Sequence, residues 1–178
     1  MEIHRATADD ALAIAKVHVR SWHETYTGLL PQAMLDSLSV ENRSTSWKNI
    51  LSSPQSFPST AAFVACRENE VVGFGACNIQ RTEELRAAGF DGEISALYVL
   101  HDEQGKGTGK ALVKAMADEL KSRSLRGGSV WVLRQNINAC GFYEHCGGRV
   151  AGEKKDVRPG VTLEEIAYGW RSIDDMSK

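Results

Sequence analysis

Residues 93–110 read EISALYVLHDEQGKGTGK and join a predicted strand to a predicted helix through a glycine-rich turn. The strand is the β-prone run 93–100, and the helix, at 107–124, places Leu112, Met116 and Leu120 on one face. Glycines let a backbone approach a ligand closely, and free N–H groups at a helix start attract anions. This stretch therefore predicts a strand–turn–helix unit that binds a phosphate or pyrophosphate.

Two common phosphate-binding patterns fit this turn poorly. A P-loop requires G-x-x-x-x-G-K-[ST], but only three residues separate Gly105 from Gly109, and Ala111 stands where the Mg²⁺-binding hydroxyl should be. A dinucleotide-binding turn requires G-x-G-x-x-G and an acidic residue about 20 positions later. Here the spacing is G-x-G-x-G, and the next strand ends in Leu133-Arg134-Gln135. A flexible connection that binds nothing stays an alternative for the turn taken alone.

Outward from this unit, the hydrophobic pattern predicts a mixed α/β domain. On the N-terminal side we expect a strand at 1–7, helices at 8–28, 31–38 and 40–52, a strand hairpin at 62–67 and 71–79, and a loop with one helical turn at 81–92. On the C-terminal side we expect a strand at 129–133, a helix at 139–145, and strands at 150–155 and 161–170 around a turn at 158–160. The central strand–helix–strand unit requires parallel pairing, and the hairpins require antiparallel pairing.

The composition is that of an ordinary globular protein. The chain has 178 residues, of which 42% are hydrophobic and 25% charged, so a disordered chain is excluded. Lys+Arg number 21 against 23 Asp+Glu, which argues against duplex nucleic acid as a partner. No segment approaches the roughly 20 apolar residues that span a bilayer, and the N-terminus lacks a signal pattern. We expect one cytoplasmic domain over residues 1–178, with no nucleic-acid and no membrane partner.

The cysteines suggest a reducing compartment. Cys66, Cys77, Cys140 and Cys146 form no C-x-x-C pair and have no metal-ligand spacing with the five histidines. We therefore expect reduced thiols and no metal site.

Three motifs in chain order resemble those of the GNAT acetyltransferase family. They are Glu93-x-x-x-Leu97-Tyr98-Val99, Gln104-x-x-Gly107-x-Gly109 and Asn136-x-x-Ala139-x-x-Phe142-Tyr143-Glu144-x-x-Gly147. They are similar to the family's pre-loop strand, its [RQ]-x-x-G-x-[GA] loop and its N-x-x-A-x-x-F-Y-E-x-x-G-F segment. The resemblance covers residues 60–170, with a weaker match to W-x-x-x-Y-x-G-L-L-P at 22–31. This chain departs at Gly148, where the family has an aromatic residue, and at Gln104, which replaces the commoner Arg.

The resemblance implies the family's fold. That fold is α/β (α+β), a mixed, mostly antiparallel sheet of six to seven strands with helices on both faces, splayed between 93–100 and 129–133. Residues 1–60 would supply an N-terminal strand and acceptor-side helices. Residues 61–134 would form the acetyl-CoA-binding core, and residues 135–178 a C-terminal helix and strands.

The resemblance also implies acetyl-CoA as co-substrate, without a metal. Backbone groups of the strand would pair with the pantetheine arm, and the loop amides would hold the pyrophosphate. The implied cofactor-binding residues are Leu97, Tyr98, Val99, Gln104, Gly105, Lys106, Gly107, Thr108, Gly109, Lys110, Asn136 and Tyr143. A simple loop cap is the alternative for Asn136.

Two residues carry the implied catalytic roles. Tyr143 matches the tyrosine that protonates the departing CoA thiolate, and a phenol with a pKa of about 10 keeps its proton at neutral pH. Glu93 matches a strand glutamate that acts as general base, often through water. The alternatives are a core aromatic for Tyr143 and a solvated carboxylate for Glu93. His23 and Glu24 are alternative bases.

The first helices would form the acceptor side of the site. We expect Trp22, Glu24 and Tyr26 to bind the substrate, with the loop 81–92 as the opposite wall. The implied reaction is acetyl transfer to the primary amine of a small molecule or peptide, by direct attack in a ternary complex. The alternative is a non-catalytic acyl-CoA-binding or regulatory module on the same fold. An exposed edge strand after Val161 would allow a homodimer.

Overall fold

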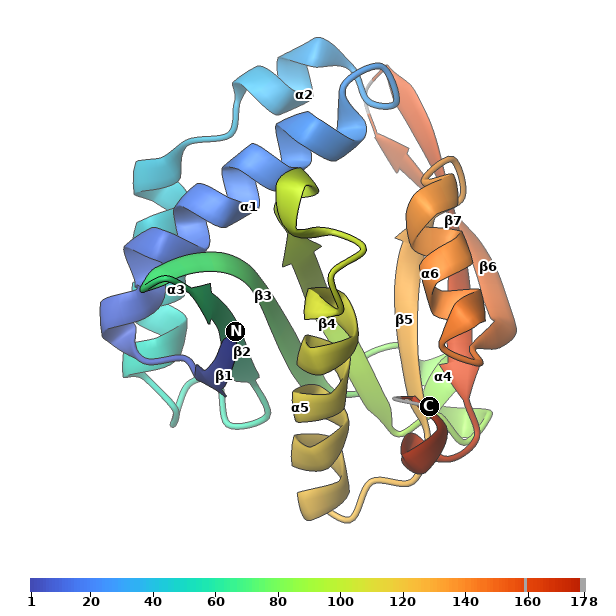
Figure 1. Cartoon of the computed structure of the whole chain (residues 1–178). Helices are drawn as coiled ribbons and strands as arrows, with labels where there is room; N and C mark the ends of the chain where they lie inside the picture. Colours follow the sequence, from blue (N-terminus) through green and yellow to red (C-terminus); the bar gives the residue numbers. More distant parts are fainter. Residues whose placement is uncertain (159, 177–178) are drawn as a thin grey trace.

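The structure, a computed structural model, describes residues 1–158 and 160–176 and contains a seven-stranded mixed sheet with the order β1-β2-β3-β4-β5-β7-β6 (Figure 1). The strands are β1 (Glu2–Arg5), β2 (Ala61–Arg67), β3 (Glu70–Ile79), β4 (Gly92–Val99), β5 (Gly128–Leu133), β6 (Arg149–Arg158) and β7 (Val161–Trp170). The α-helices are α1 (Ala11–Tyr26), α2 (Gln32–Asp36), α3 (Val40–Ser52), α4 (Glu83–Ala87), α5 (Thr108–Ser122) and α6 (Ile137–His145). Short 3-10 helices are η1 (Ala8–Asp10), η2 (His101–Glu103) and η3 (Ile173–Asp175).

Every element expected from the sequence is present, with shifted ends. The first helix begins as the 3-10 turn η1, where the Asp10 carboxylate accepts hydrogen bonds from the backbone and side chain of Thr7. The strand expected at 150–155 continues to Arg158, which lengthens the β6–β7 hairpin. Pro159, in the expected turn at 158–160, lies outside the described residues. In the part of the chain that the structure describes, no helix has the length and apolar content needed to cross a membrane.

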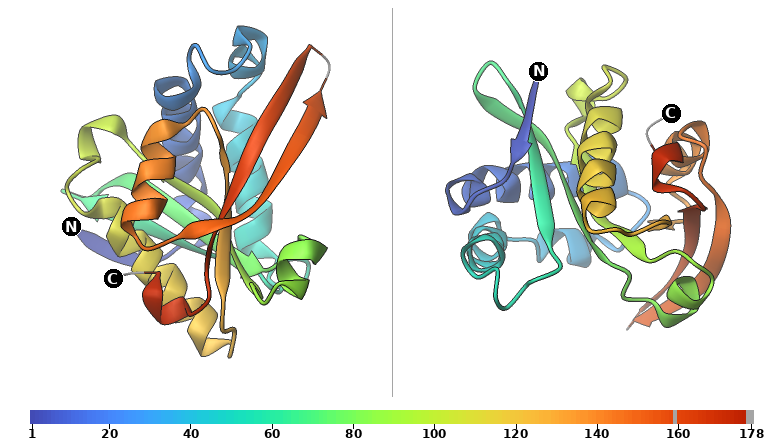
Figure 2. Two further views of the ribbon diagram at one scale, coloured as in Figure 1. Left: turned by 90° about the vertical axis from the view of Figure 1, so that its right-hand side faces the viewer. Right: turned by 90° about the horizontal axis from the view of Figure 1, so that it is seen from below.

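Helices cover both faces of the sheet, as expected (Figure 2). On one face Ile14 of α1 and Trp47 of α3 pack with Phe74 of β3. On the other face Met116 of α5 packs with Ile94 of β4, and α6 joins the same cluster. β3 is buried along most of its length because it lies between the two helical layers.

The sheet is splayed between β4 and β5, as the resemblance implied. These parallel strands pair only through Gly92–Ile94 and Gly128–Val130, and Figure 1 shows them diverging toward their carboxyl ends. The closed end is held by the Asp91 carboxylate, which accepts hydrogen bonds from the amides of Arg126 and Gly127 at 2.8 and 2.9 Å. Each strand keeps an antiparallel partner on its other side, so the sheet stays continuous at one end and opens at the other.

The prediction that the strand after Val161 lies at an exposed edge of the sheet is wrong. That strand is β7, and it pairs antiparallel with β5 on one side and with β6 on the other. The edges of the sheet are β1 and β6. After α6 the chain first forms the edge strand β6 and then turns back, so that β7, the later strand of the hairpin, lies between β6 and β5.

Gly148 stands where the family motif has an aromatic residue. The side chain of Trp170 fills the space next to it. A Cβ at position 148 would lie 2.8 Å from the Tyr143 carbonyl oxygen and 2.9 Å from the Trp170 ring. Trp170 is 2% exposed, and its indole N–H donates to the Cys146 carbonyl at 2.7 Å. The glycine therefore leaves no void beneath α6, because the indole comes from the last strand instead.

We predict that Gly148→Ala lowers the free energy of unfolding by about 1–3 kcal/mol, because the methyl group has no room. Gly141, in α6, is the control: a Cβ there meets nothing within 4 Å. Gly141→Ala should stabilise the protein by up to about 1 kcal/mol, since alanine is the better helix former. Urea unfolding measures both. Equal stability of the two variants would contradict the packing of Trp170.

His18 is a buried core histidine between α1 and the sheet. Its ring stacks on Tyr98 with centroids 4.8 Å apart, and its Nδ1 accepts a hydrogen bond from the Trp47 indole at 3.5 Å. Burial, aided by the positive charge of Arg43, lowers the pKa of His18 from 6.5 to about 4. The ring is therefore neutral near pH 7.

This burial predicts a pH-dependent stability. Between pH 6.5 and 4 the unfolded chain binds a proton at His18 that the folded protein does not, so stability falls as the pH falls through this window. The loss is about 3 kcal/mol for this residue. Denaturant unfolding across the window should show a shallower dependence for His18→Gln than for the unchanged protein. An identical dependence in both would exclude a depressed pKa.

Candidate active site

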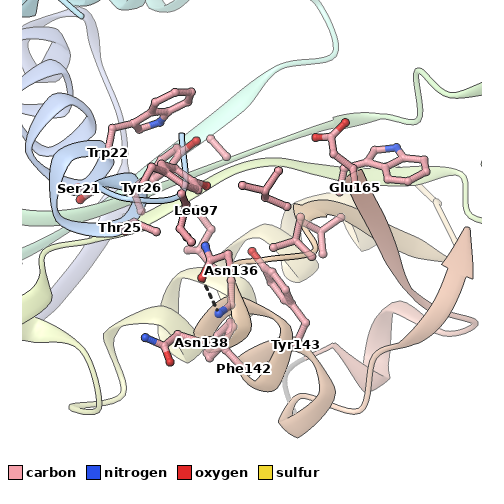
Figure 3. Close-up of a pocket in the computed structure, with 18 of the residues that line it drawn as sticks. Ser21, Trp22, Thr25, Tyr26, Leu97, Asn136, Asn138, Phe142, Tyr143 and Glu165 are labelled. Atoms are coloured by element: carbon pink, nitrogen blue, oxygen red, sulfur yellow. Dashed lines mark hydrogen bonds between the residues drawn. The ribbon is translucent and has the colours of Figure 1, made fainter. Parts of the chain in front are cut away.

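The splay between β4 and β5 opens into a pocket of about 800 Å³. Figure 3 shows side chains from α1, β4, α6 and β7 around it. Of the residues expected at a cofactor or substrate site, the pocket is lined by Trp22, Glu24, Tyr26, Glu93, Leu97, Tyr98, Val99, Gln104, Gly105, Gly109, Asn136 and Tyr143. Lys106 and Gly107 belong to the glycine turn, and Thr108 and Lys110 to the first turn of α5; the pocket lining does not include these four residues.

Beyond Ile94, strand β4 has one unpaired edge. Residues 95–99 face β3 on one side, where pairing continues to Val99, and the pocket on the other. An unpaired edge presents backbone N–H and C=O groups that can accept another extended chain. The side-chain amide of Gln104 donates a hydrogen bond to the Val99 carbonyl at 3.1 Å and connects the glycine turn to the end of this strand.

The glycine turn has the backbone expected of an anion site. Gly105 and Gly107 have φ angles of 71° and 85°, a region that favours glycine. α5 begins at Thr108, and the first helical bond runs from Ala111 to the Gly107 carbonyl. The N–H groups of the first turn therefore have no partner within the helix and sit at its positive end.

Charge and burial at the turn add to this arrangement. The Thr108 side chain is 1% exposed, and within the described residues its hydroxyl has no hydrogen-bond partner. Lys110 is exposed, whereas Lys106 pairs with Glu103 at 3.0 Å. Among the described residues, the Lys110 ammonium has no ion-pair partner, and together with the amides at the start of α5 it suits an anionic ligand.

Tyr143 lies on α6 and is 5% exposed, and its side chain reaches the pocket (Figure 3). Its ring contacts Phe142 and Trp170 edge-on. Burial raises the pKa of Tyr143 well above 10, with smaller contributions from Tyr26 and Tyr98. The phenol therefore stays protonated at neutral pH and can donate a hydrogen bond, and then its proton, to a leaving group as negative charge develops on that group.

Asn136 is a helix cap that also lines the pocket, and its cofactor-binding role stays a prediction. Its side-chain oxygen accepts a hydrogen bond from the Ala139 amide at 3.1 Å and caps α6, as the dashed line in Figure 3 shows. The residue also lines the pocket beside Tyr26. Burial raises the pKa of the Tyr26 phenol strongly, and a hydrogen bond with Asn136 opposes this rise.

Glu93 is 6% exposed at the closed end of the pocket and is held by Arg81. One carboxylate oxygen accepts from Nη2 of Arg81 at 2.7 Å, and the other accepts from Nε at 3.1 Å and from the Arg81 backbone amide at 3.2 Å. A base at Glu93 would have to compete with this guanidinium for its own oxygens. The general-base role of Glu93 stays a prediction.

The residues expected on the acceptor side differ in whether their side chains already have polar partners within the protein. Trp22 and Tyr26 meet edge-on with ring centroids 5.0 Å apart, and both face the pocket. The Glu24 carboxylate accepts from Nε of Arg20 at 2.7 Å and from the His101 amide at 2.9 Å. Glu24 therefore joins α1 to the 3-10 helix η2, and its oxygens already have partners.

The β6–β7 hairpin forms the wall opposite α1, where the loop 81–92 was expected. Of that loop, Arg81 reaches the pocket, whereas Glu83 pairs with Arg86 and Asp91 caps the backbone beside β5. The wall consists of Trp131 of β5 and the hairpin residues Lys154, Arg158, Leu163 and Glu165. Sequence reasoning missed these residues because none belongs to a motif, and their common facing depends on the hairpin register.

Within residues 1–158 and 160–176, no three His, Cys, Asp or Glu side chains gather as a set of metal ligands. The cysteines are free thiols. The polar groups present are suited to hydrogen bonding and proton transfer.

Comparisons with known proteins agree with this geometry. The model of the Acetyltransferase (GNAT) family matches residues 19–148. The uncharacterized N-acetyltransferase YuaI of Bacillus subtilis is 33% identical over 172 residues, which are 96% of this chain and 93% of that protein. A mycothiol acetyltransferase of Streptomyces griseus is 30% identical over 78% of this chain and 39% of its own length.

A solved structure supports the fold. The PaiA N-acetyltransferase of Thermoplasma acidophilum, in complex with coenzyme A, superposes with a TM-score of 0.72 at 22% identity, over 93% of this chain and 96% of that one. The family model spans most of the chain and covers the strand, the glycine turn and α6. The chain therefore belongs to the GNAT acetyltransferase family.

Proposed function

We propose that this chain is one acetyl-CoA-dependent N-acetyltransferase domain, which transfers an acetyl group to a primary amine by direct attack in a ternary complex. The observation that carries the proposal is the continuity of one pocket. An unpaired strand edge, a turn of free amides and a buried neutral phenol all border it. The free thiols fit the cytoplasm as the place of action.

The chain's own groups match the parts of acetyl-CoA. The amides at the start of α5 and the ammonium of Lys110 suit its diphosphate. The free edge of β4 at residues 95–99 suits the pantetheine arm, whose amide groups can pair with a strand. The Thr108 hydroxyl, which is buried at the first residue of α5, has no hydrogen-bond partner among the described residues. Acetyl-CoA would supply the acetyl group as a thioester.

The transfer needs a neutral amine and a proton for the leaving thiolate. The amine nitrogen attacks the carbonyl carbon, so that a C–N bond forms, the C–S bond breaks and the nitrogen loses one proton. Tyr143 donates its phenolic proton to the sulfur as the C–S bond breaks, and the proton that the amine nitrogen loses returns to the phenolate, directly or by way of a base. Glu93 is the proposed base, with Arg81 as its competitor.

A non-catalytic acyl-CoA-binding module is the alternative. It would use the same strand edge and turn but would have no need of Tyr143. No observation favours this module over the enzyme. The two hypotheses differ in whether proton donation by Tyr143 is needed.

Tyr143→Phe should lower kcat by about 10²-fold or more, because the variant cannot protonate the leaving thiolate. Coenzyme A should bind within about threefold of its original affinity, since the ring still fills the space. Thiol release measures turnover, and calorimetry measures binding. Tyr168→Phe is the matched control, because that hydroxyl bonds to Glu144 at 2.7 Å, away from the pocket. Unchanged turnover in Tyr143→Phe would refute the acid role.

Gly107→Ala should weaken coenzyme A binding by about tenfold, because a side chain disfavours the φ of 85° that aims the amides. Gly89→Ala is the control, since Gly89 has a comparable φ of 92° and lies just after α4, outside the glycine turn. The control should lose stability but bind coenzyme A as before. Equal binding by all three proteins would mean that the turn does not hold the diphosphate.

A further inference from the structure

One corner of the pocket is a favourable place for a cation, and in this structure the side-chain ammonium of a lysine lies there. The ammonium of Lys154, on β6, lies 4.3 Å from the centroid of the Trp131 ring and 3.1 Å from the Glu165 carboxylate. All three residues line the pocket. An aromatic face together with a carboxylate is a favourable environment for an ammonium group. We call this place the Trp131–Glu165 corner.

The strand register places this corner on the pocket side of the hairpin. Lys154 is the cross-strand partner of Glu165, and the next pair joins Lys155 to Glu164. Side chains alternate between the two faces of a strand, so the second pair points away from the pocket. Its ammonium and carboxylate lie 3.4 Å apart and do not line the pocket. The hairpin thus carries two similar ion pairs, one on each face.

Lys154 is a weakly held occupant. Its side chain is 44% exposed on the edge strand β6, and an exposed ion pair of this kind adds little stability. Glu165 is less exposed, at 25%, and among the described residues Lys154 is the one cation within ion-pairing distance of it. Glu93, by contrast, receives three hydrogen bonds from Arg81. An incoming ammonium can therefore displace Lys154 far more easily than Arg81.

The corner suits a nitrogen that does not react. A neighbouring carboxylate and aromatic face stabilise the charged form of an amine and raise its pKa, whereas the attacking nitrogen must be neutral. An apolar cluster lies beside the corner, with Leu30, Leu133 and Leu163 at its centre and Trp22 and Tyr26 against it. That cluster can enclose a hydrocarbon chain between the corner and the Tyr143 side of the pocket.

We propose that Trp131 and Glu165 bind a second, non-reacting cationic nitrogen of the acceptor in the place held by Lys154 in the free protein. The acceptor is then a diamine, or another amine that carries a second positive charge on an apolar chain. This inference rests on the proposed acetyl transfer for the identity of the reacting end. The corner itself is a cation-binding site whether or not transfer occurs.

The test compares diaminopentane with pentylamine, which has the same chain and lacks the second nitrogen. The unchanged protein should acetylate diaminopentane with the higher kcat/KM, by about tenfold. Glu165→Gln should remove this preference by raising KM for diaminopentane about tenfold while kcat and the pentylamine kinetics stay within about twofold. Lys154→Met should lower KM for diaminopentane, because the internal competitor is gone.

Glu164→Gln and Lys155→Met are matched controls from the outer face of the hairpin and should change neither substrate's kinetics. Equal use of both amines by the unchanged protein would overturn the proposal. So would an equal loss for both amines in Glu165→Gln, which would make Glu165 a base rather than a binding group. A response of the outer-face controls as large as that of the pocket-face variants would do the same.

Calorimetry with diaminopentane separates failure of the corner from failure of the proposed function. If neither amine is acetylated, diaminopentane should still bind the coenzyme A-loaded protein more tightly than pentylamine, and Glu165→Gln should abolish the difference. That result would support the corner and count against the enzyme. Acetylation without any diaminopentane preference in kinetics or binding would support the enzyme and overturn the corner.

Discussion

The short parallel contact between β4 and β5 is the constraint on which the whole site depends. The two strands pair over three residues each and then part, while each keeps an antiparallel neighbour on its far side. A sheet that divides in this way leaves backbone hydrogen-bonding groups of a central strand without a neighbouring strand to pair with. The exposed edge of β4 and the pocket beside it follow directly from this geometry.

The elements around the division are fixed by contacts from distant parts of the chain. Asp91 holds the closed end through the amides of Arg126 and Gly127. Trp170, from the last strand, packs on Gly148 beneath α6 and replaces the aromatic residue that the family motif places within the motif itself. The position of Tyr143 at the pocket therefore depends on residues far from it in sequence, through one tightly packed layer.

Electrostatics sort the ionisable groups of the site into two kinds. Buried groups without an opposite charge are neutral: burial keeps Tyr143 protonated and His18 unprotonated. Glu93 and Glu165, two carboxylates that line the pocket, are both paired, but unequally: Glu93 accepts three hydrogen bonds from the side chain and backbone of Arg81, whereas Glu165 has one ion pair with the exposed Lys154. The weaker pair lies on the hairpin wall, where a ligand can enter.

The sequence by itself determined the local features: the glycine turn, the amphipathic helix after it and the motif tyrosine, because backbone freedom and hydrophobic spacing act over a few residues. It also predicted nearly every helix and strand, and the splay through family resemblance. Only the tertiary structure decided that β7, and not β6, pairs with β5 in the sheet. It also decided that the Glu93 carboxylate is hydrogen-bonded to Arg81 and that Lys154 and Glu165 face the pocket. These depend on strand order and register, and a slip of one residue would turn each hairpin side chain to the other face.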